Sequence, residues 1–261
     1  MDPGLRTAAT GMIAQQLRVE VIANNLANVN TTGFKRSRAH FEDLLYQMVE
    51  APSTVGESAA ATEGIQIGRG ARLAAVQRID LQGALEQTAR PLDMAIDGEG
   101  FFPVTMPDGT PAYTRDGSFT ISDQGMIVTS SGYSLEPGIT IPEQAKELSI
   151  SSTGIVSAMV DASGEPIEIG RIELVRFPNT AGLRALGENL FSQTVASGEP
   201  ASGFPQEDGF GRLLQGALEA SNVEVVQEMV DMIAALRAYE VNSKAVKAGE
   251  EMSQMTNSLM R

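Results

Sequence analysis

The sequence predicts an α+β protein, in which N- and C-terminal α-helices pair as a coiled-coil-like inner domain and an antiparallel all-β middle domain is inserted between them. Three observations lead to this prediction. Apolar residues recur with seven-residue spacing near both ends of the chain, which is typical of helices that pack against other helices. Between the ends the apolar period becomes two, and short β-prone runs alternate with Asp-Gly turns, as in antiparallel hairpins.

The C-terminal helix is predicted to begin at Ser221, because Ser221 and Glu224 have the spacing of a capping box. Its apolar residues form two offset seams. The first seam consists of Val226, Met229, Ile233 and Leu236. The second seam consists of Ala234, Ala238, Val241, Ala245, Ala248, Met252, Met255 and Leu259. Two offset seams require more than one partner helix, so this helix is expected to form an assembly interface.

The N-terminal helix is predicted to begin with Asp2 as its N-cap and Pro3 at its first position, where a missing N–H has no cost. It is expected to end among Asn28, Asn30 and Gly33, because these residue types tolerate the left-handed conformation at a helix end. Its heptad seam consists of Leu5, Ala9, Met12, Gln16, Val19, Ala23 and Leu26. The single glutamine in this seam is expected to fix the register. This helix is therefore a second expected assembly interface.

The domain organisation follows from these changes of period. Residues 1–30 and 221–261 are predicted to form the terminal helical inner domain. Residues 31–71 and 198–220 are predicted to form an extended connecting region with a loop or hairpin, because they are rich in Gly, Pro, Ser and Ala. Residues 72–197 are predicted to form a β-rich outer domain, which is long enough for a core of its own.

Two stretches follow the first helix. The basic cluster of residues 35–38 could contact phosphate, but a solvated or interfacial turn is favoured, with Phe34, Phe41 and Leu45 anchoring it to a neighbour. Residues 50–70 contain few large apolar side chains, so they are expected to form a flexible loop or loose hairpin that becomes ordered against a partner.

Composition excludes several classes of protein. The chain has 261 residues and a net charge of −14, from 19 basic and 33 acidic side chains, which disfavours nucleic-acid binding. It contains no cysteine and a single histidine, so we expect no disulfide, no thiol catalysis, no metal site and no cofactor. No apolar run reaches the roughly 18 residues of a membrane span. The N-terminus lacks the pattern of a cleaved secretory signal.

No catalytic set emerges from the motifs. Residues 98–100 and 68–70 resemble phosphate-binding loops only in their glycines, and both are interpreted as turns. His40 is interpreted as a surface or packing residue, because no nucleophile motif accompanies it. The central carboxylates lack the spacing of a calcium loop and are interpreted as turn residues; they are Asp93, Asp97, Glu99, Asp108 and Asp116. An enzyme is not expected.

Several motifs are more specific. Residues 22–36 read IANNLANVNTTGFKR, and residues 97–102 read DGEGFF, followed by YTRDGSF at 113–119. Near the other end, Ser-Asn-Val at 221–223 is followed by RAYEVNSK at 237–244. In this order the motifs resemble those of the flagellar rod and hook proteins, and the resemblance covers nearly the whole chain. FEDLLY at 41–46 and GIQIG at 64–68 make it most similar to the subunits of the distal rod.

The resemblance implies a structural axial subunit that polymerises into the distal rod, the drive shaft that transmits torque across the periplasm and encloses the export channel. The implied partners are copies of itself in a helical tube, proximal rod proteins, the hook protein, the P-ring and L-ring proteins, and the export apparatus during secretion. Nucleic acid and membrane insertion are not implied. The implied location is the periplasmic rod of the basal body, reached through the type III export apparatus without a cleaved signal peptide. In such proteins the segment corresponding to Gln47–Glu63 is associated with straightness and rigidity.

Three alternatives stay open at this stage, of which the least favoured is an enzyme on a β-scaffold with a carboxylate-lined cleft near Asp93 and Asp97. The chain could be another rod or hook subunit of the same family. It could also be a non-flagellar adaptor that dimerises through an antiparallel coiled coil of its termini and binds a ligand with its β-domain. The adaptor would form a discrete dimer in solution with ordered ends.

Overall fold

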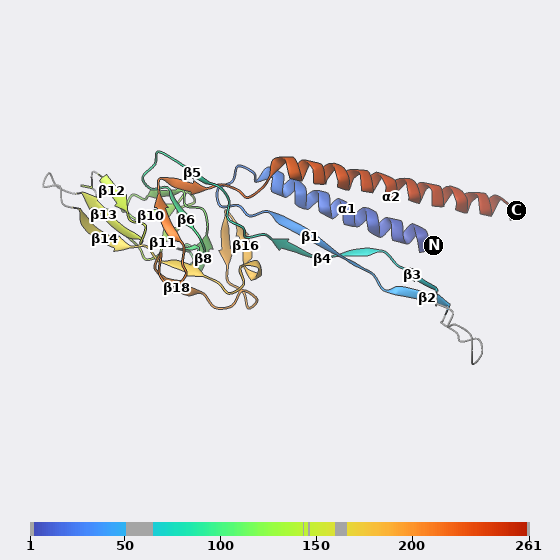
Figure 1. Ribbon diagram of the computed structural model, residues 1–261, viewed down its shortest axis with the longest axis horizontal. Helices are drawn as coiled ribbons and strands as arrows, with labels where there is room; N and C mark the ends of the chain where they lie inside the picture. The colour runs from blue at the N-terminus through green and yellow to red at the C-terminus, as the bar shows by residue number, and fades with distance from the viewer. Residues whose placement is uncertain (1–2, 51–64, 143, 146, 160–165, 260–261) are drawn as a thin grey trace. The chain divides into compact units, whose positions relative to one another are not determined.

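The computed structural model describes residues 3–50, 65–142, 144–145, 147–159 and 166–259 (Figure 1). The chain divides into two compact units. The helical unit comprises Met1–Ala27, Ser37–Gln77 and Glu224–Arg261, and the β-rich unit comprises Asn28–Arg36 and Arg78–Val223. The predicted fold class is confirmed, because the terminal helices pack together and the middle of the chain is antiparallel β structure.

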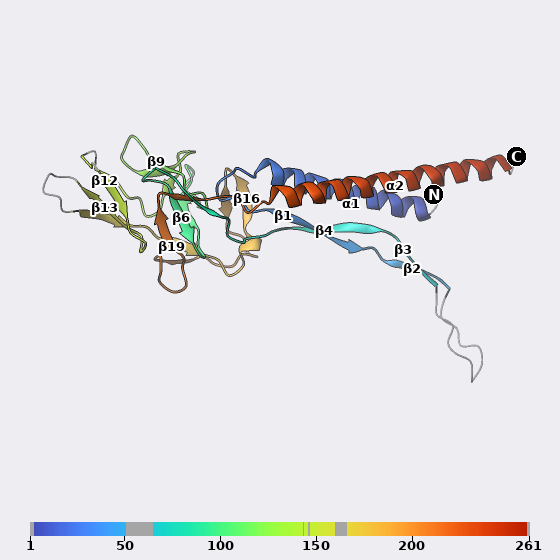
Figure 2. The same cartoon turned by 45° about the horizontal axis from the view of Figure 1, so that its top comes forward.

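The helical unit is built on two long helices that run side by side in both views (Figures 1 and 2), α1 (Pro3–Ala27) and α2 (Val225–Leu259). They are antiparallel. The amide of Asn25, near the end of α1, donates a 3.2 Å hydrogen bond to Glu228, near the start of α2. At the opposite end Leu5 contacts Gly249.

A seam of small and polar residues joins the two helices. On α2 the contacting residues are seven apart, at Glu228, Ala235, Asn242 and Gly249. A Cβ atom added at Gly249 would lie 2.6 Å from Leu5 Cδ2, so glycine at this position allows close approach of the helices. This contact seam differs from the apolar seams identified in the sequence, because it contains a carboxylate, an amide and a glycine. The predicted pairing is therefore correct, but on α2 three of the four contacting residues are ones that an apolar pattern does not reveal.

Replacing Gly11 with leucine is expected to weaken the pairing of α1 with α2. A Cβ atom at Gly11 would lie 2.9 Å from Asn242 Nδ2, so a leucine must displace the Asn242 side chain or push the helices apart, at a cost of about 1–3 kcal/mol. Thermal unfolding followed by the helical circular-dichroism signal measures the loss. Ile13→Leu is the control, because Ile13 is 60% exposed, and it is expected to stay within about 0.5 kcal/mol of the unchanged chain. Equal stabilities of the two variants would contradict the close approach at Gly11.

A two-stranded ribbon completes the helical unit. Its strands are β1 (Ser37–Asp43), β2 (Tyr46–Glu50), β3 (Ile65–Gly68) and β4 (Ala71–Arg78). Strand β1 pairs with β4 and β2 pairs with β3, and between these pairs the Leu44 N–H donates to the Gly70 carbonyl. Gly70 has φ +113° and lies so close to Thr10 of α1 that a Cβ atom would come within 2.0 Å of the Thr10 hydroxyl. Residues 50–70 were expected to form a flexible loop or a loose hairpin. Glu50 and Ile65–Gly68 belong to the paired strands β2 and β3, and residues 51–64 lie outside the described residues.

The β-rich unit consists of short strands, as the Asp-Gly spacing predicts. In the described residues they are β5 (Leu85–Gln87), β6 (Met94–Asp97), β7 (Phe102–Thr105), β8 (Pro111–Thr114), β9 (Phe119–Ile121), β10 (Ile127–Thr129), β11 (Ser134–Leu135), β12 (Glu147–Ile150), β13 (Ile155–Met159), β14 (Ile167–Arg171), β15 (Leu174–Arg176), β16 (Arg184–Gly187), β17 (Leu190–Ser192), β18 (Ala201–Gly203), β19 (Arg212–Gln215) and β20 (Ala217–Glu219), with a 3-10 turn, η1 (Thr180–Gly182). The largest sheet has the order β16-β17-β8-β7-β11-β10-β9. A second sheet has the order β12-β13-β14, and the other pairs are β15-β18, β19-β6 and β20-β5.

Hairpin turns and an aromatic core hold this unit together. Gly109 and Gly125 adopt φ +79° and +78° in the tight turns of the β7–β8 and β9–β10 hairpins, where the sequence predicts turns. Phe102 and Phe119 are fully buried and meet edge to face, with ring centroids 5.2 Å apart. A second buried cluster surrounds Phe101. These contacts give the unit a core of its own.

The start of α2 differs from the sequence prediction. The Ser221 hydroxyl accepts from the Val223 amide at 3.3 Å, and the helix begins only at Val225, after the predicted N-cap. The cause is local. The side chain of Asn222 bonds to the Arg36 amide and to the Ile79 and Leu81 carbonyls, which holds this stretch out of the helix. The capping-box prediction was therefore wrong, although a helix follows immediately.

Candidate functional site

The exposed faces of α2 carry most of the residues predicted as an assembly interface. All four members of the first predicted seam are exposed: Val226 (77%), Met229 (51%), Ile233 (49%) and Leu236 (47%). In the second seam the named interface residues Val241, Ala245, Met252, Met255 and Leu259 are exposed as well. A large patch of exposed apolar side chains is typical of a surface that another protein covers in the assembled state. The α2 helix therefore carries extensive apolar surface that α1 does not cover.

The predicted seam of α1 is more covered than that of α2. Leu5, Ala9, Met12, Val19 and Leu26 are half-buried, and Gln16 and Ala23 are exposed. The fully buried positions of α1 are instead Ala14, Ile22 and Asn25. Phe34 lies in the β-rich unit, half-buried in the turn that follows α1.

The seams predicted from the sequence did not include some apolar residues that the structure shows to be exposed. Ile13 on α1 is 60% exposed, and Val230 on α2 is 56% exposed. Both lie one position beyond a predicted seam residue. A search for a wider apolar stripe, rather than for strict three- and four-residue steps, finds them.

A buried cluster of charged side chains includes Lys35, from the motif that follows α1, together with Arg115 and Glu219. Lys35, Arg115 and Glu219 are 5%, 8% and 1% exposed. The Lys35 ammonium donates to Glu219 Oε1 and, at 2.8 Å, to the Leu81 carbonyl. Arg115 Nη1 lies 3.3 Å from the other oxygen of the same carboxylate. Burial lowers the pKa of Lys35 below its usual value, while the charge of Glu219 acts in the opposite direction.

The same cluster corrects the interpretation of the basic residues. Residues 35–38 were interpreted as a solvated or interfacial turn, but Lys35 is buried. Lys35 can be buried because its ammonium pairs with the Glu219 carboxylate, which also accepts a hydrogen bond from the Gly83 amide at 2.9 Å. A buried charge is tolerated only when it is paired and hydrogen-bonded, and this carboxylate and ammonium satisfy one another.

Asn222, from the Ser-Asn-Val motif, ties neighbouring segments together. Its Oδ1 accepts from the Arg36 amide at 2.7 Å, and its Nδ2 donates to the carbonyls of Ile79 (2.8 Å) and Leu81 (2.9 Å). Within the helical unit Asn25 plays a similar part, since it bonds both backbone groups of Ser37 at 2.9 Å. The asparagines of both motifs therefore act as cross-links between backbone segments.

The described residues contain no group of three or more His, Cys, Asp or Glu that could hold a metal ion. His40 lies exposed on β1. Neither long helix, over its described length, is apolar enough to cross a membrane. The described residues do present apolar helix surface, which is suited to association with other apolar surfaces.

Three family models match parts of the chain, and all three describe flagellar rod or hook proteins. A model described as flagella basal body rod protein matches residues 5–35. The flagellar hook protein FlgE/F/G D1 domain matches residues 95–158, and the flagellar basal body rod FlgEFG protein C-terminal model matches residues 214–259. The fold and its exposed helix faces thus define a protein of the flagellar rod and hook class.

Full-length relatives narrow the class. Flagellar basal-body rod proteins FlgG from Borreliella burgdorferi and Caulobacter vibrioides are 51% and 49% identical to the chain, over 100% and 98% of both sequences. The FlgG protein of Bacillus subtilis is 40% identical over 98% of both. The chain belongs to the FlgG family of flagellar basal-body rod proteins. It is a structural subunit of the distal rod and not an enzyme, and the adaptor alternative is set aside.

Proposed function

We propose that the chain polymerises through its terminal helices into a helical tube of identical subunits, which encloses the export channel and transmits torque across the periplasm. The observation that carries the proposal is the uncovered apolar surface of α2, whose large seam side chains are 47–86% exposed in the single chain. Each such side chain contributes up to about 1.5–3 kcal/mol when it is buried. Several together offset the roughly 4–15 kcal/mol that association costs.

The proposed interface consists of the predicted seam residues of both helices and the turn residue Phe34. The α1 residues are half-buried or exposed, so they can add contacts to a neighbour without leaving the α1–α2 pair. In the rod, residues 1–30 and 221–261 form the inner layer, residues 31–71 and 198–220 the connecting region, and residues 72–197 the outer layer. Acidic residues exceed basic ones by 14 over the chain, which disfavours nucleic acid as a partner.

The proposed partners beyond the chain itself are the proximal rod proteins, the hook protein, the surrounding P-ring and L-ring proteins, and the export apparatus. The proposal includes transport of the chain through the flagellar type III apparatus without cleavage of a signal peptide. Membership of the rod family supports the rod and hook proteins among these partners, because it implies assembly with other rod and hook components.

Imaging of purified basal bodies by cryo-electron microscopy tests the proposal. The expected map shows this chain in the distal part of the rod, with the seam residues of α2 buried against neighbouring copies. Mass spectrometry of the same preparation is expected to find the chain uncleaved at its N-terminus. A rod in which α2 faces solvent or the open channel along both seams would contradict the proposal.

A further inference from the structure

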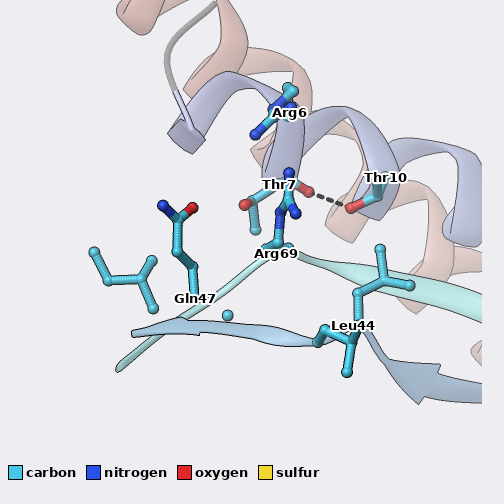
Figure 3. Close-up of a pocket in the computed structure, with 9 residues that line it drawn as sticks. Arg6, Thr7, Thr10, Leu44, Gln47 and Arg69 are labelled. Atoms are coloured by element: carbon cyan, nitrogen blue, oxygen red, sulfur yellow. Dashed lines mark hydrogen bonds between the residues drawn. The ribbon is translucent and has the colours of Figure 1, made fainter. Parts of the chain in front are cut away.

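The helical unit contains a pocket between α1 and the ribbon, with a volume of about 320 Å³. Leu44, Leu45 and Ile67 give it apolar walls, and Arg6 and Arg69 stand beside them. Figure 3 shows Arg6 extending from α1 and Arg69 directed from the ribbon toward that helix. The pocket therefore combines an apolar surface with two cationic groups.

Neither arginine has a carboxylate partner among the described residues. The ion pairs of the described chain involve other arginines, such as Arg18 with Asp231 and Arg72 with Glu42. Arg6 also lies close to the N-terminus of α1, and no acidic residue occupies the first turn of this helix. A cation at the positive end of the helix dipole is unfavourable unless an anion lies nearby. The pocket is thus suited to an apolar group accompanied by a negative charge.

The end of α2 has this chemistry. Leu5 lies opposite Gly249, and α1 begins only two residues before Leu5, at Pro3. Beyond Gly249, α2 therefore soon has no part of α1 beside it. Residues 250–259, here called the overhang, therefore extend past α1, and every described side chain in it is exposed. The overhang begins with Glu250 and Glu251 and continues with Met252, Met255 and Leu259 on one helix face.

We propose that the pocket receives the overhang of a second copy of this chain, with Met252, Met255 and Leu259 against the apolar walls and Glu250 and Glu251 against Arg6 and Arg69. Methionine fits such a role because its unbranched side chain adapts to irregular apolar surfaces. In the same chain the overhang is part of the continuous helix α2 and does not line the pocket. This inference rests on the proposed self-assembly and assigns one specific contact within it.

Disulfide trapping tests the contact, because the chain contains no cysteine of its own. Two variants, Leu45→Cys and Met255→Cys, are co-expressed as the only rod subunits of this type, and basal bodies are purified and oxidised. Both positions are exposed in the single chain, at 85% and 59%. The expected product is a covalent dimer that contains one copy of each variant. The matched control pairs Met255→Cys with Val76→Cys, which is 49% exposed on the ribbon but outside the pocket. The pocket pair is expected to give about tenfold more dimer than the control pair.

The outcomes separate the two proposals. Rods that contain the chain but give no more dimer with the pocket pair than with the control overturn the inference alone. A further variant carries Leu45→Cys and Met255→Cys in the same chain. A disulfide within that one chain also overturns the inference, since the pocket is then occupied by the chain's own overhang. Basal bodies whose rods lack this chain overturn the proposed function, and the inference falls with it.

Charge reversal gives a second readout, which stays informative if a cysteine variant does not assemble. Arg6→Glu with Arg69→Glu, or Glu250→Arg with Glu251→Arg, is expected to reduce rod yield about tenfold by placing like charges together. The combination of all four substitutions is expected to restore most of that yield. Two reversals whose effects simply multiply would overturn the inference, because independent sites show no such rescue.

Discussion

Ile233→Asp is expected to abolish rod formation while the single subunit keeps its fold. Ile233 is 49% exposed in the single chain, so a carboxylate there remains solvated before assembly. In the proposed interface the same carboxylate must be buried without a partner, which costs several kcal/mol per subunit. The concentration required for polymerisation should rise at least about a hundredfold, which corresponds to roughly 2.8 kcal/mol. Electron microscopy of basal bodies and circular dichroism of the purified subunit measure the two effects.

A matched control distinguishes this effect from that of added charge. Lys244→Asp places the same carboxylate on an exposed, already charged position of α2 that lies outside both seams and outside residues 250–259, and rods should form normally. On α1, Leu26→Glu should also prevent assembly, and Ala27→Glu is its control, because the neighbouring residue is exposed and feels the same helix dipole. Rods of ordinary length and stability from Ile233→Asp would rule out the helix-driven assembly.

Glu219→Ala is expected to destabilise the β-rich unit by about 3–5 kcal/mol, because it leaves the buried charges of Lys35 and Arg115 without their shared partner. For a unit of this size the thermal midpoint should fall by about 10 °C, at roughly 2–4 °C per kcal/mol. Differential scanning calorimetry or urea unfolding followed by the β-sheet signal measures the change.

An exposed ion pair provides the control for this cluster. Glu207 lies 2.6 Å from Arg171 but is 54% exposed, so Glu207→Ala should cost less than about 1 kcal/mol. Replacing the three buried groups together by Leu and Met should recover most of the loss, since an apolar cluster leaves no charge unpaired. If Glu219→Ala and Glu207→Ala proved equally mild, the buried cluster would not contribute as described.

Much of the fold could be predicted from local signals. The N-terminal helix begins at Pro3 and gives way to a turn at Asn28 as its residue types indicate, and Asp108-Gly109 forms a hairpin turn where expected. These features depend on backbone preferences within a few residues. The fold class followed from them because the period of apolar residues changes where the chain passes from helix to sheet.

The remainder depends on partners distant in the sequence. Glu228 and Asn242 join α2 to α1, yet neither is apolar, and the heptad to which they belong can be recognised only once the register of the antiparallel pair is known. Lys35 looks like part of a basic surface until Glu219, 184 positions away, is placed beside it. The exposed seams of α2 were predictable for the opposite reason, because apolar periodicity alone reveals them.

The cross-links made by Asn222 have a mechanical consequence. The chain passes between its two units at four places, after residues 27, 36, 77 and 223. Asn222 is hydrogen-bonded to Arg36 and Ile79, and thus lies next to three of these four passages. A pulling force on any one of these three connecting segments is therefore shared with the other two through the Asn222 hydrogen bonds. No single connection has to carry the whole force.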